Sequence, residues 1–425
     1  MGAGVGAGPG MAGSGAKRPR EPGGRGGSGA PAEEPARPAA LRAPRVLAEA
    51  PLAEEGPGAR AVVPSAGSAW QAGRCAALGA AGSSAVVAVA AGPRVLWACA
   101  PAGGAGAVEG KNGVYLARRG APMLPARELG PLCHESEVQA LVAAPGAEPG
   151  SVQVASADAK GRCTVMEVQK GWQAAALAGA GELGPAKVYS VSPRAYGEAG
   201  WTGVALSPEN ARLVASARFF ARDITMYDGG FPVGEFHTAE RPRALRFLPA
   251  GLLGNSPALL AAAEGNKLSL WDARVERGCV SRHSCPDQVG VVASGAPCAG
   301  FSGGVIATAG EERAVNLWDP RRMGQLFSRY SPDAIRSPIT FLEFSSWDSS
   351  SCFVGTQGGE LLHGTWIPFR KSGATLDNTQ MAAAKAAAKG TCVRGGGRWA
   401  GMCKLPGQDH LVGLTDRGSL ITFVP

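Results

Sequence analysis

The sequence predicts an all-β protein built from repeated sets of short antiparallel strands. Two stretches, residues 258–274 and 304–321, carry nearly the same pattern: a run of small apolar residues, a polar turn, and an alternating run that ends in Trp-Asp-x-Arg. Apolar and polar residues alternate with a period of two, which is the period of a strand and not of a helix. Trp271 and Trp318 lie 47 residues apart, a spacing typical of repeated structural units.

The composition agrees with a turn-rich protein and excludes several other classes. The 425 residues include 63 Gly and 32 Pro, and only 18% are charged. No apolar run approaches the roughly 18 residues that a membrane span needs, so we expect no membrane contact. The ten cysteines form no CxxC pair, and with no secretion signal we expect reduced thiols in the cytosol or nucleus.

Residues 1–59 are predicted to be a disordered tail, and residues 60–425 a single folded domain. The tail is dominated by Gly, Pro and Ala, and no aromatic residue precedes Trp70. Such a segment cannot bury enough apolar surface to offset the entropy of ordering it. Lys17, Arg18 and Arg20 form a short basic cluster that is either a nuclear-import signal or a patch of solvated charge. We therefore expect a nuclear or cytoplasmic protein, and the cluster favours the nucleus.

From about residue 60 the chain divides into seven sets of three strands, separated by Gly, Pro and Asn turns. The expected strands are, set by set, residues 75–78, 85–91 and 95–99; 137–143, 152–156 and 162–168; 201–208, 212–217 and 223–228; 243–248, 257–263 and 267–272; 287–294, 304–309 and 314–319; 337–344, 352–355 and 360–365; and 398–404, 410–414 and 418–424.

The third strands of these sets end at regular intervals. Successive ends in the middle of the chain lie 44, 47 and 46 residues apart, and the outer intervals are longer because they hold Gly/Ala-rich inserts. One insert, MAAAKAAAKG from Met381, has high helix propensity and is predicted to form a short helix. The ends are Trp97, Met166, Tyr227, Trp271, Trp318, Gly364 and Phe423.

These residues resemble the WD-repeat family. The endings at Trp271-Asp272 and Trp318-Asp319 resemble the dipeptide that names the family, and VALSPENARLVASA (residues 204–217) resembles its first two strands. The resemblance covers about residues 60–425. It implies a β-propeller of four-stranded blades around a central axis, and the seven third-strand ends imply seven blades.

Closure of the propeller is expected to need a strand from the N-terminal region. The last set has three strands, so the outermost strand of that blade would come from the residues near Val46 and Leu47, or from residues 61–63.

One departure from the family concerns the Asp usually found in the turn before the Trp. Glu264 and the Glu311-Glu312 pair stand there instead, so we expect an incomplete hydrogen-bond network in those two blades.

No catalytic motif stands out. His134, His237 and His283 could act as general bases, but the family resemblance implies that such residues bond a backbone group or a Ser and hold a loop. There is no GxSxG, P-loop, HExxH or paired-carboxylate motif. Cys279 and Cys285 flank His283, yet an accidental grouping at a strand edge is favoured over a metal site. We therefore expect no enzyme, no catalytic residue, no cofactor and no metal.

The leading interpretation is a non-enzymatic WD-repeat scaffold that binds other proteins or peptides through its loops. The loop residues expected to contact a partner are Arg222, Arg241, Arg243 and Trp347.

Two alternatives stay open at this point. The sixteen-residue segments 259–274 and 306–321, here called the WDxR boxes, resemble the box of substrate receptors of cullin-type ubiquitin ligases. The resemblance implies that Arg274 and Arg321, next to Asp272 and Asp319, dock a ligase adaptor; the other interpretation is that each Arg pairs within its own blade. The second alternative is a nucleic-acid partner, because the net charge is +8, although the sequence does not interleave basic and aromatic residues.

Overall fold

The computed structural model describes residues 44–55, 60–65, 70–101, 107–109, 115–117, 123–179, 182–184, 186–191, 197–253, 256, 258–295, 304–324, 326–331, 335–347, 351–365, 392–394 and 396–424. These residues belong to one compact unit, Leu41–Pro425. Residues 1–43, with the basic cluster at Lys17, and the insert from Met381 lie outside the described residues.

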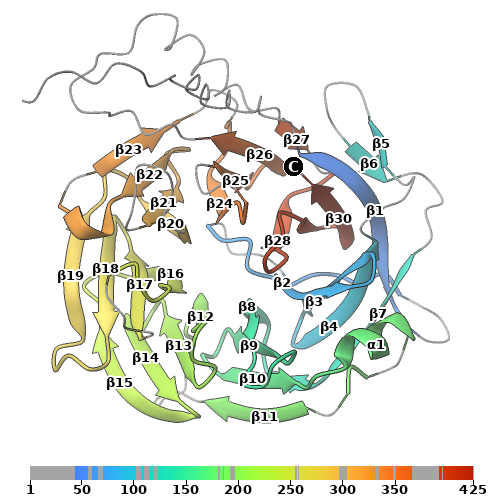
Figure 1. Cartoon of the computed structure of the whole chain (residues 1–425), viewed down its shortest axis with the longest axis horizontal. Coiled ribbons are helices and arrows are strands. Elements are labelled where there is room, and N and C mark those ends of the chain that lie inside the picture. Colours follow the sequence, from blue (N-terminus) through green and yellow to red (C-terminus); the bar gives the residue numbers. More distant parts are fainter. Residues whose placement is uncertain are drawn as a thin grey trace, which may run out of the picture. The chain divides into compact units, whose positions relative to one another are not determined.

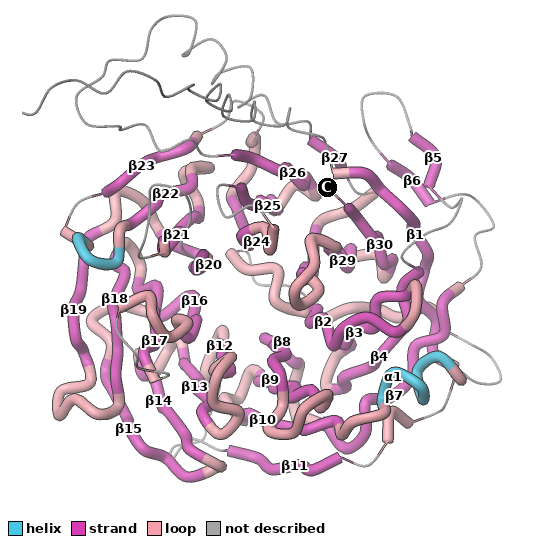
Figure 2. The backbone as a smooth tube through the Cα atoms, viewed as in Figure 1, coloured by secondary structure: helices cyan, strands magenta, loops and turns pink. Residues whose placement is uncertain are grey.

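The described part of the chain is a β-propeller arrangement of antiparallel sheets (Figure 1). Five sheets have four strands each, one sheet has eight, and a separate hairpin joins β5 (Ala107–Glu109) to β6 (Tyr115–Ala117). Strands make up almost all of the regular structure (Figure 2), and the short helices are α1 (Trp172–Leu177) and η2 (Pro320–Arg322). The all-β prediction is confirmed.

Each four-stranded sheet has its strands in sequence order from the centre of the ring to its rim. The sheets are β8 (Val138–Pro145), β9 (Val152–Asp158), β10 (Cys163–Val168) and β11 (Ala186–Val191); β12 (Thr202–Leu206), β13 (Leu213–Arg218), β14 (Asp223–Asp228) and β15 (Phe231–His237); β16 (Pro242–Phe247), β17 (Leu259–Glu264), β18 (Lys267–Asp272) and β19 (Cys279–Ser284); β20 (Val289–Gly295), β21 (Val305–Gly310), β22 (Val315–Trp318) and β23 (Leu326–Tyr330); and β24 (Ile339–Phe344), β25 (Ser351–Thr356), β26 (Glu360–Thr365) and β27 (Cys392–Arg394).

The eight-stranded sheet contains two runs of four antiparallel strands. One run is β2 (Cys75–Ala81), β3 (Ser84–Ala91), β4 (Arg94–Pro101) and β7 (Leu124–Cys133), and the other is β28 (Trp399–Lys404), β29 (Leu411–Thr415), β30 (Ser419–Val424) and β1 (Arg45–Glu54). A short parallel pairing of β1 with β7, from Leu52↔Leu124 to Glu54↔Ala126, joins them. Every strand expected from the alternating pattern is present, with ends shifted by a few residues.

The N-terminal region supplies the strand that closes the ring. Strand β1 pairs antiparallel with β30, from Arg45↔Val424 to Pro51↔Ser419. The first of the two expected closing segments is therefore confirmed, and the folded domain begins before residue 60, so the expected boundary was too late. The Ala-, Pro- and Glu-rich composition of β1 resembles that of the tail, but its residues pack against β30, and Val46 and Leu52 are buried.

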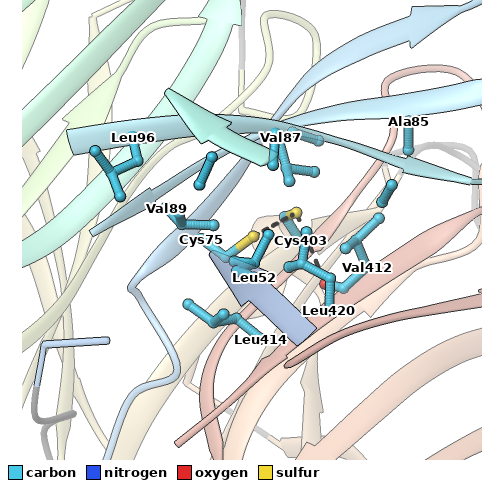
Figure 3. Packing of buried hydrophobic residues seen from close by; sticks show 14 of the residues in the cluster. Leu52, Cys75, Ala85, Val87, Val89, Leu96, Cys403, Val412, Leu414 and Leu420 are labelled. Carbon is cyan, nitrogen blue, oxygen red and sulfur yellow. Dashed lines mark hydrogen bonds between the residues drawn. The ribbon is translucent and has the colours of Figure 1, made fainter. Parts of the chain in front are cut away.

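A hydrophobic cluster fills the seam where the first and last parts of the chain meet. Its residues come from β1 to β4, from β7 and from β28 to β30, with Val62 and Leu405 from loops. Figure 3 shows Leu52 of β1 and Leu420 of β30 beside Val87 of β3, with the sulfurs of Cys75 and Cys403 facing each other. Because small side chains such as Ala and Val dominate this cluster, the sheets pack closely, which favours dispersion contacts.

Six inner strands, β8, β12, β16, β20, β24 and β28, share one direction through the ring. The residues at the ends of β8, β12, β16, β20, β24 and β28 all line the same central cavity. We call the surface on which inner strands begin the start face, and the surface on which they end the end face. Because neighbouring strands in a sheet alternate in direction, the β13–β14 turn and the β15–β16 connection lie on the start face.

A short segment crosses the central channel near the start face. This segment, Trp70–Arg74, is here called the channel strap. The N–H of Ala72 donates to the carbonyl of Thr340 at 2.9 Å, and the N–H of Leu141 donates to the carbonyl of Gly73 at 2.9 Å. These bonds tie the strap to inner strands on different sides of the ring, β24 and β8.

Among the described residues, no helix has the length and hydropathy needed to cross a membrane.

Candidate partner-binding site

The structure divides the residues expected to contact a partner between the two faces. Arg222 lies in the β13–β14 turn, and Arg241 and Arg243 lie at the β15–β16 connection, so these three share the start face. Trp347, which is 74% exposed, follows β24 on the end face, and so do the ends of both WDxR boxes. A single site therefore includes the three arginines and not the other residues.

Three aromatic side chains join the arginines to make a continuous cluster. The Trp70 and Phe219 rings stack with centroids 5.3 Å apart and an interplanar angle of 20°, and Phe220 meets Phe219 edge to face at 5.6 Å. These geometries are favoured by the ring quadrupoles. We name the whole group the start-face cluster; its members are Trp70, Phe219, Phe220, Arg222, Arg241 and Arg243.

Two guanidinium groups cover aromatic faces within the cluster. Cζ of Arg241 lies 5.1 Å from the centroid of Phe219 and 5.8 Å from that of Phe220. Cζ of Arg243 lies 5.1 Å from the centroid of Trp70, and its Nη1 donates to Oε1 of Glu311 at 3.0 Å. Cation–π contacts of this kind are worth about 0.5–2 kcal/mol each. These contacts restrict the guanidinium groups of Arg241 and Arg243, so less side-chain conformational entropy is lost when a ligand binds.

The exposed part of the cluster combines apolar surface with positive charge. Phe220 is 55% exposed, and Arg222 and Arg241 are exposed beside it. Of the described carboxylates, none forms an ion pair with Arg222 or Arg241. Arg222 also has a positive φ of 54°, which non-glycine residues adopt only rarely. The site therefore presents a ring and two guanidinium groups that remain available to an anionic partner.

Backbone hydrogen bonds hold the turn that carries Phe219 and Phe220. The N–H of Phe219 donates to the carbonyl of Trp201 at 3.0 Å, and the N–H of Phe220 donates to that of Ala199 at 3.0 Å. An ion pair between Arg218 and Asp223 closes the base of the turn, with Nε 2.9 Å from Oδ1. The turn is therefore rigidly attached to the segment that precedes β12.

A buried glutamate holds the neighbouring connection that carries Arg241. Glu264 is fully buried, accepts a hydrogen bond from the hydroxyl of Ser269, and accepts one from the N–H of Ala239 at 2.9 Å. Ser269 in turn accepts from Nε1 of Trp271 at 2.8 Å. Glu264 thus reaches the Ser and the connection that an Asp would otherwise serve, so the hydrogen-bond network of this sheet does contain a carboxylate.

The corresponding Trp of the next sheet has its own bond. Nε1 of Trp318 donates to Oγ1 of Thr308 at 2.9 Å. Glu311, one of the two glutamates expected in place of the usual Asp, is exposed and pairs with Arg243 of the neighbouring sheet. No described carboxylate is seen to bond this Trp–Thr pair. Asp287, just before β20 of the same sheet, instead accepts a hydrogen bond from Nδ2 of Asn316 at 3.0 Å.

His134, Ser156 and Asp158 form an arrangement that resembles a catalytic triad. His134 Nε2 lies 2.8 Å from Ser156 Oγ, and its Nδ1 lies 3.4 Å from Asp158 Oδ2. Burial would raise the pKa of Asp158, but bonds from His134 and from backbone N–H groups lower it. All three residues are buried, and neither described cavity includes them. A substrate could not reach this Ser, so the group acts as a structural network that fixes the β7–β8 connection.

The first WDxR box closes on itself. Arg274 donates from Nη2 to Oδ2 of Asp272 at 2.7 Å and from Nε to Oδ1 at 3.0 Å. The side-chain bond from Arg274 lowers the pKa of Asp272. In the second box the backbone N–H of Arg321 donates to Oδ1 of Asp319 at 2.9 Å. Asp319 thereby caps the N-terminus of η2. The two boxes thus have different local structures.

The described residues contain no group of three metal-ligating side chains. Cys279, His283 and Cys285, which the sequence places close together, therefore do not converge. Cys279 donates instead to the carbonyl of Ser281, and burial raises the pKa of Cys285 to about 12.

Sequence reasoning missed Trp70, Phe219 and Phe220. The adjacent phenylalanines, placed in a polar turn between two strands, were the available signal, because apolar residues in an exposed turn often serve binding. The stacking of Trp70 on Phe219 joins residues far apart in the sequence and could not be read from it. No protein-family model and no curated protein matches the sequence, so the role of the site is inferred from its geometry alone.

Proposed function

We propose that this protein is a non-enzymatic scaffold that binds other proteins, and that the start-face cluster receives an acidic peptide segment carrying an apolar side chain. The observation that carries the proposal is the exposed Phe220 side chain, whose ring lies beside the guanidinium group of Arg241. Arg222 is exposed two positions along the same turn, and no described carboxylate forms an ion pair with either arginine. Carboxylates bind guanidinium groups in bidentate geometry, and an apolar residue would cover the ring.

The rigidity of the cluster supports this role. The Phe219–Phe220 turn, the channel strap and the β15–β16 connection are each held by backbone hydrogen bonds. A preorganised site loses little conformational entropy on binding, and aromatic and arginine side chains dominate binding energy in known interfaces. The cluster joins two neighbouring sheets and the channel strap, so it depends on the packing of these three parts.

We also infer that the eight-stranded sheet is two blades, which gives the ring seven blades, and that the fold is a WD-repeat propeller. The sheet order supports this count, because two four-stranded runs meet only at the three-residue β1–β7 pairing. The WD endings at Trp271 and Trp318 support the family. The basic residues Lys17, Arg18 and Arg20 support a nuclear or cytoplasmic protein.

Selection from a random peptide library on phage tests the binding proposal. We expect enriched peptides to combine Asp or Glu with an apolar or aromatic residue, and to lose binding at least tenfold with Phe220→Ala or with Arg222→Ala plus Arg241→Ala. Arg212→Ala is the matched control, because this exposed arginine pairs with Asp228. Enriched peptides without acidic residues, or binding that survives both variants, would contradict the proposal.

A nucleic-acid partner is the second candidate, and one observation favours it. Within the start-face cluster Arg241 lies over Phe219 and Phe220 and Arg243 lies over Trp70, so basic and aromatic side chains meet in space although they are not interleaved in the sequence. Single-stranded nucleic acid binds such surfaces by stacking and phosphate contacts. A fluorescent oligonucleotide would then bind with an affinity that falls steeply as salt rises. No binding at low salt would remove this candidate.

A further inference from the structure

Two cysteines face each other at the seam of the ring. Cys75 begins β2 and Cys403 lies in β28, and these are the first and last inner strands along the chain. Their sulfur atoms lie 3.4 Å apart although the residues are separated by 328 positions in the sequence. Figure 3 shows both sulfurs pointing into the same part of the hydrophobic cluster. This distance is within van der Waals contact of two thiols.

The backbone around the pair is held at close range. The N–H of Arg74 donates to the carbonyl of Ala400 at 3.3 Å, and Gly73 and Gly401 form a β-bridge. A Cβ added to Gly401 would lie 2.5 Å from the backbone nitrogen of Cys75, so only glycine fits here. These contacts hold the two chain segments against each other, and the sulfurs, now 3.4 Å apart, must approach to the roughly 2.05 Å of a disulfide.

A cavity gives small molecules a route to the pair. Both Cys75 and Cys403 line a central cavity of about 540 Å³, which extends to loop residues such as Pro208 and Pro406 on the end face. The channel strap lies on the start-face side of this cavity. A reagent the size of a peroxide can therefore enter from the end face, although each thiol is almost entirely buried from bulk solvent.

We propose that Cys75 and Cys403 form a modification site at which a hydroperoxide converts the two thiols into a disulfide. In the first step the sulfur of Cys75 attacks the peroxide: an S–O bond forms, the O–O bond breaks, and water or an alcohol leaves. In the second step the sulfur of Cys403 attacks that sulfenic acid, the S–S bond forms, and the oxygen leaves as water with the thiol proton. Overall the two thiols lose two electrons and two protons, and the peroxide is reduced.

The order of the two steps follows from the surroundings of Cys403. The hydrogen bond with Cys75 and burial raise the pKa of Cys403 well above its ordinary value. A thiol that resists ionisation is a poor first nucleophile toward a peroxide, so Cys403 reacts second. Cys403 then lies next to the sulfenic sulfur of Cys75, and this proximity raises the rate of its attack although the thiol is a weak nucleophile.

The disulfide would join the first and last inner strands covalently. Without it, the ring is closed at this seam by hydrogen bonds and apolar contacts, chiefly the β1–β30 pairing and the cluster around Leu52. A cross-link over so long a stretch of chain restricts the unfolded state strongly. We therefore expect the oxidised protein to unfold at a higher temperature than the reduced protein. This inference does not depend on the proposed peptide-binding function.

The test uses the full-length protein treated with hydrogen peroxide under native conditions and then alkylated and digested. Mass mapping is expected to find a Cys75–Cys403 linked peptide two hydrogens lighter than the sum of its parts, and dithiothreitol should abolish it. Thermal unfolding should shift upward with oxidation in the native sequence and in Cys163→Ser, a control at another buried thiol, but not in Cys403→Ser.

Three results would overturn the proposal. They are the absence of the linked peptide after all exposed thiols have reacted, a dominant link from either residue to another cysteine, and oxidation of Cys75 or Cys403 to sulfinic acid in place of cross-linking. Because the mass map uses the native sequence, it decides the question even if a serine variant fails to fold.

Discussion

Arg274 folds back onto Asp272 of its own WDxR box, with Nη2 2.7 Å from Oδ2 and Nε 3.0 Å from Oδ1. The side chain of Arg274 is 65% exposed, whereas the side chain of Asp272 is 7% exposed. The carboxylate of Asp272 therefore holds one edge of the guanidinium group while the rest of the arginine side chain faces solvent. An ion pair of such exposure is screened by water and contributes little to stability.

The first prediction concerns the ligase-receptor hypothesis. If the WDxR boxes dock a ligase adaptor, affinity purification from cells recovers the adaptor, and Arg274→Ala combined with Arg321→Ala loses it, because both guanidinium groups would be removed. Circular dichroism is expected to stay unchanged, since both arginines are exposed. Recovery that survives the double substitution would count against this hypothesis, with Arg277→Ala as a control at another exposed arginine of the same loop.

The second prediction concerns Glu264, which is fully buried and bonds Ser269 and the N–H of Ala239. Glu264→Ala would leave buried donors without acceptors, so we expect a loss of about 2–4 kcal/mol in the free energy of unfolding. Glu264→Gln keeps one acceptor and should cost less. Urea denaturation measures both, and Glu311→Ala, at an exposed glutamate, should change stability by less than about 1 kcal/mol. Equal stability of Glu264→Ala and the native sequence would contradict the assigned network.

The third prediction concerns the seam. Because a Cβ at position 401 would lie 2.5 Å from the backbone nitrogen of Cys75, Gly401→Ala must push β28 away from the channel strap. We expect a destabilisation of about 2–3 kcal/mol, as for other overpacked sites. Gly324→Ala is the control, since an added Cβ there meets nothing within 4 Å. A Gly401→Ala protein with unchanged thermal unfolding would show that the seam is looser than described.

The fourth prediction concerns pH. Burial raises the pKa of Glu49, in the closing strand β1, from 4.5 to about 7. The folded protein therefore holds this proton more tightly than the unfolded chain, and stability falls as pH rises through this interval until the folded-state carboxyl is ionised near pH 7. The loss is on the order of 1–3 kcal/mol. Glu49→Gln should remove this part of the slope in a pH series of denaturation midpoints, while the exposed Glu312→Gln should leave it.

The apolar runs and turns were sufficient to place the first three strands of every sheet, because strands such as β17, Leu259–Glu264, are buried along their whole length. Most of the outermost strands were not predicted, for the opposite reason. β15 and β19 expose residues such as Phe231 and Val280 to solvent, so their sequences resemble those of loops. β1 is the exception: its composition resembles the tail, yet the residues near Val46 and Leu47 were expected to close the ring, and they pair with β30.

Only part of the candidate site could be predicted from the sequence. Arg222, Arg241 and Arg243 were identified as loop residues, and the structure places them on one face. Trp70 reaches them only because the channel strap crosses the ring, which depends on contacts between distant residues. The role of Glu264 was also missed, since the extra methylene of glutamate changes its reach in a way that only the folded geometry reveals.

The channel strap links two walls of the ring through its interior. Backbone bonds join Ala72 to β24 and Gly73 to β8. Spreading the toroid at either strand would therefore cost backbone hydrogen bonds at this brace.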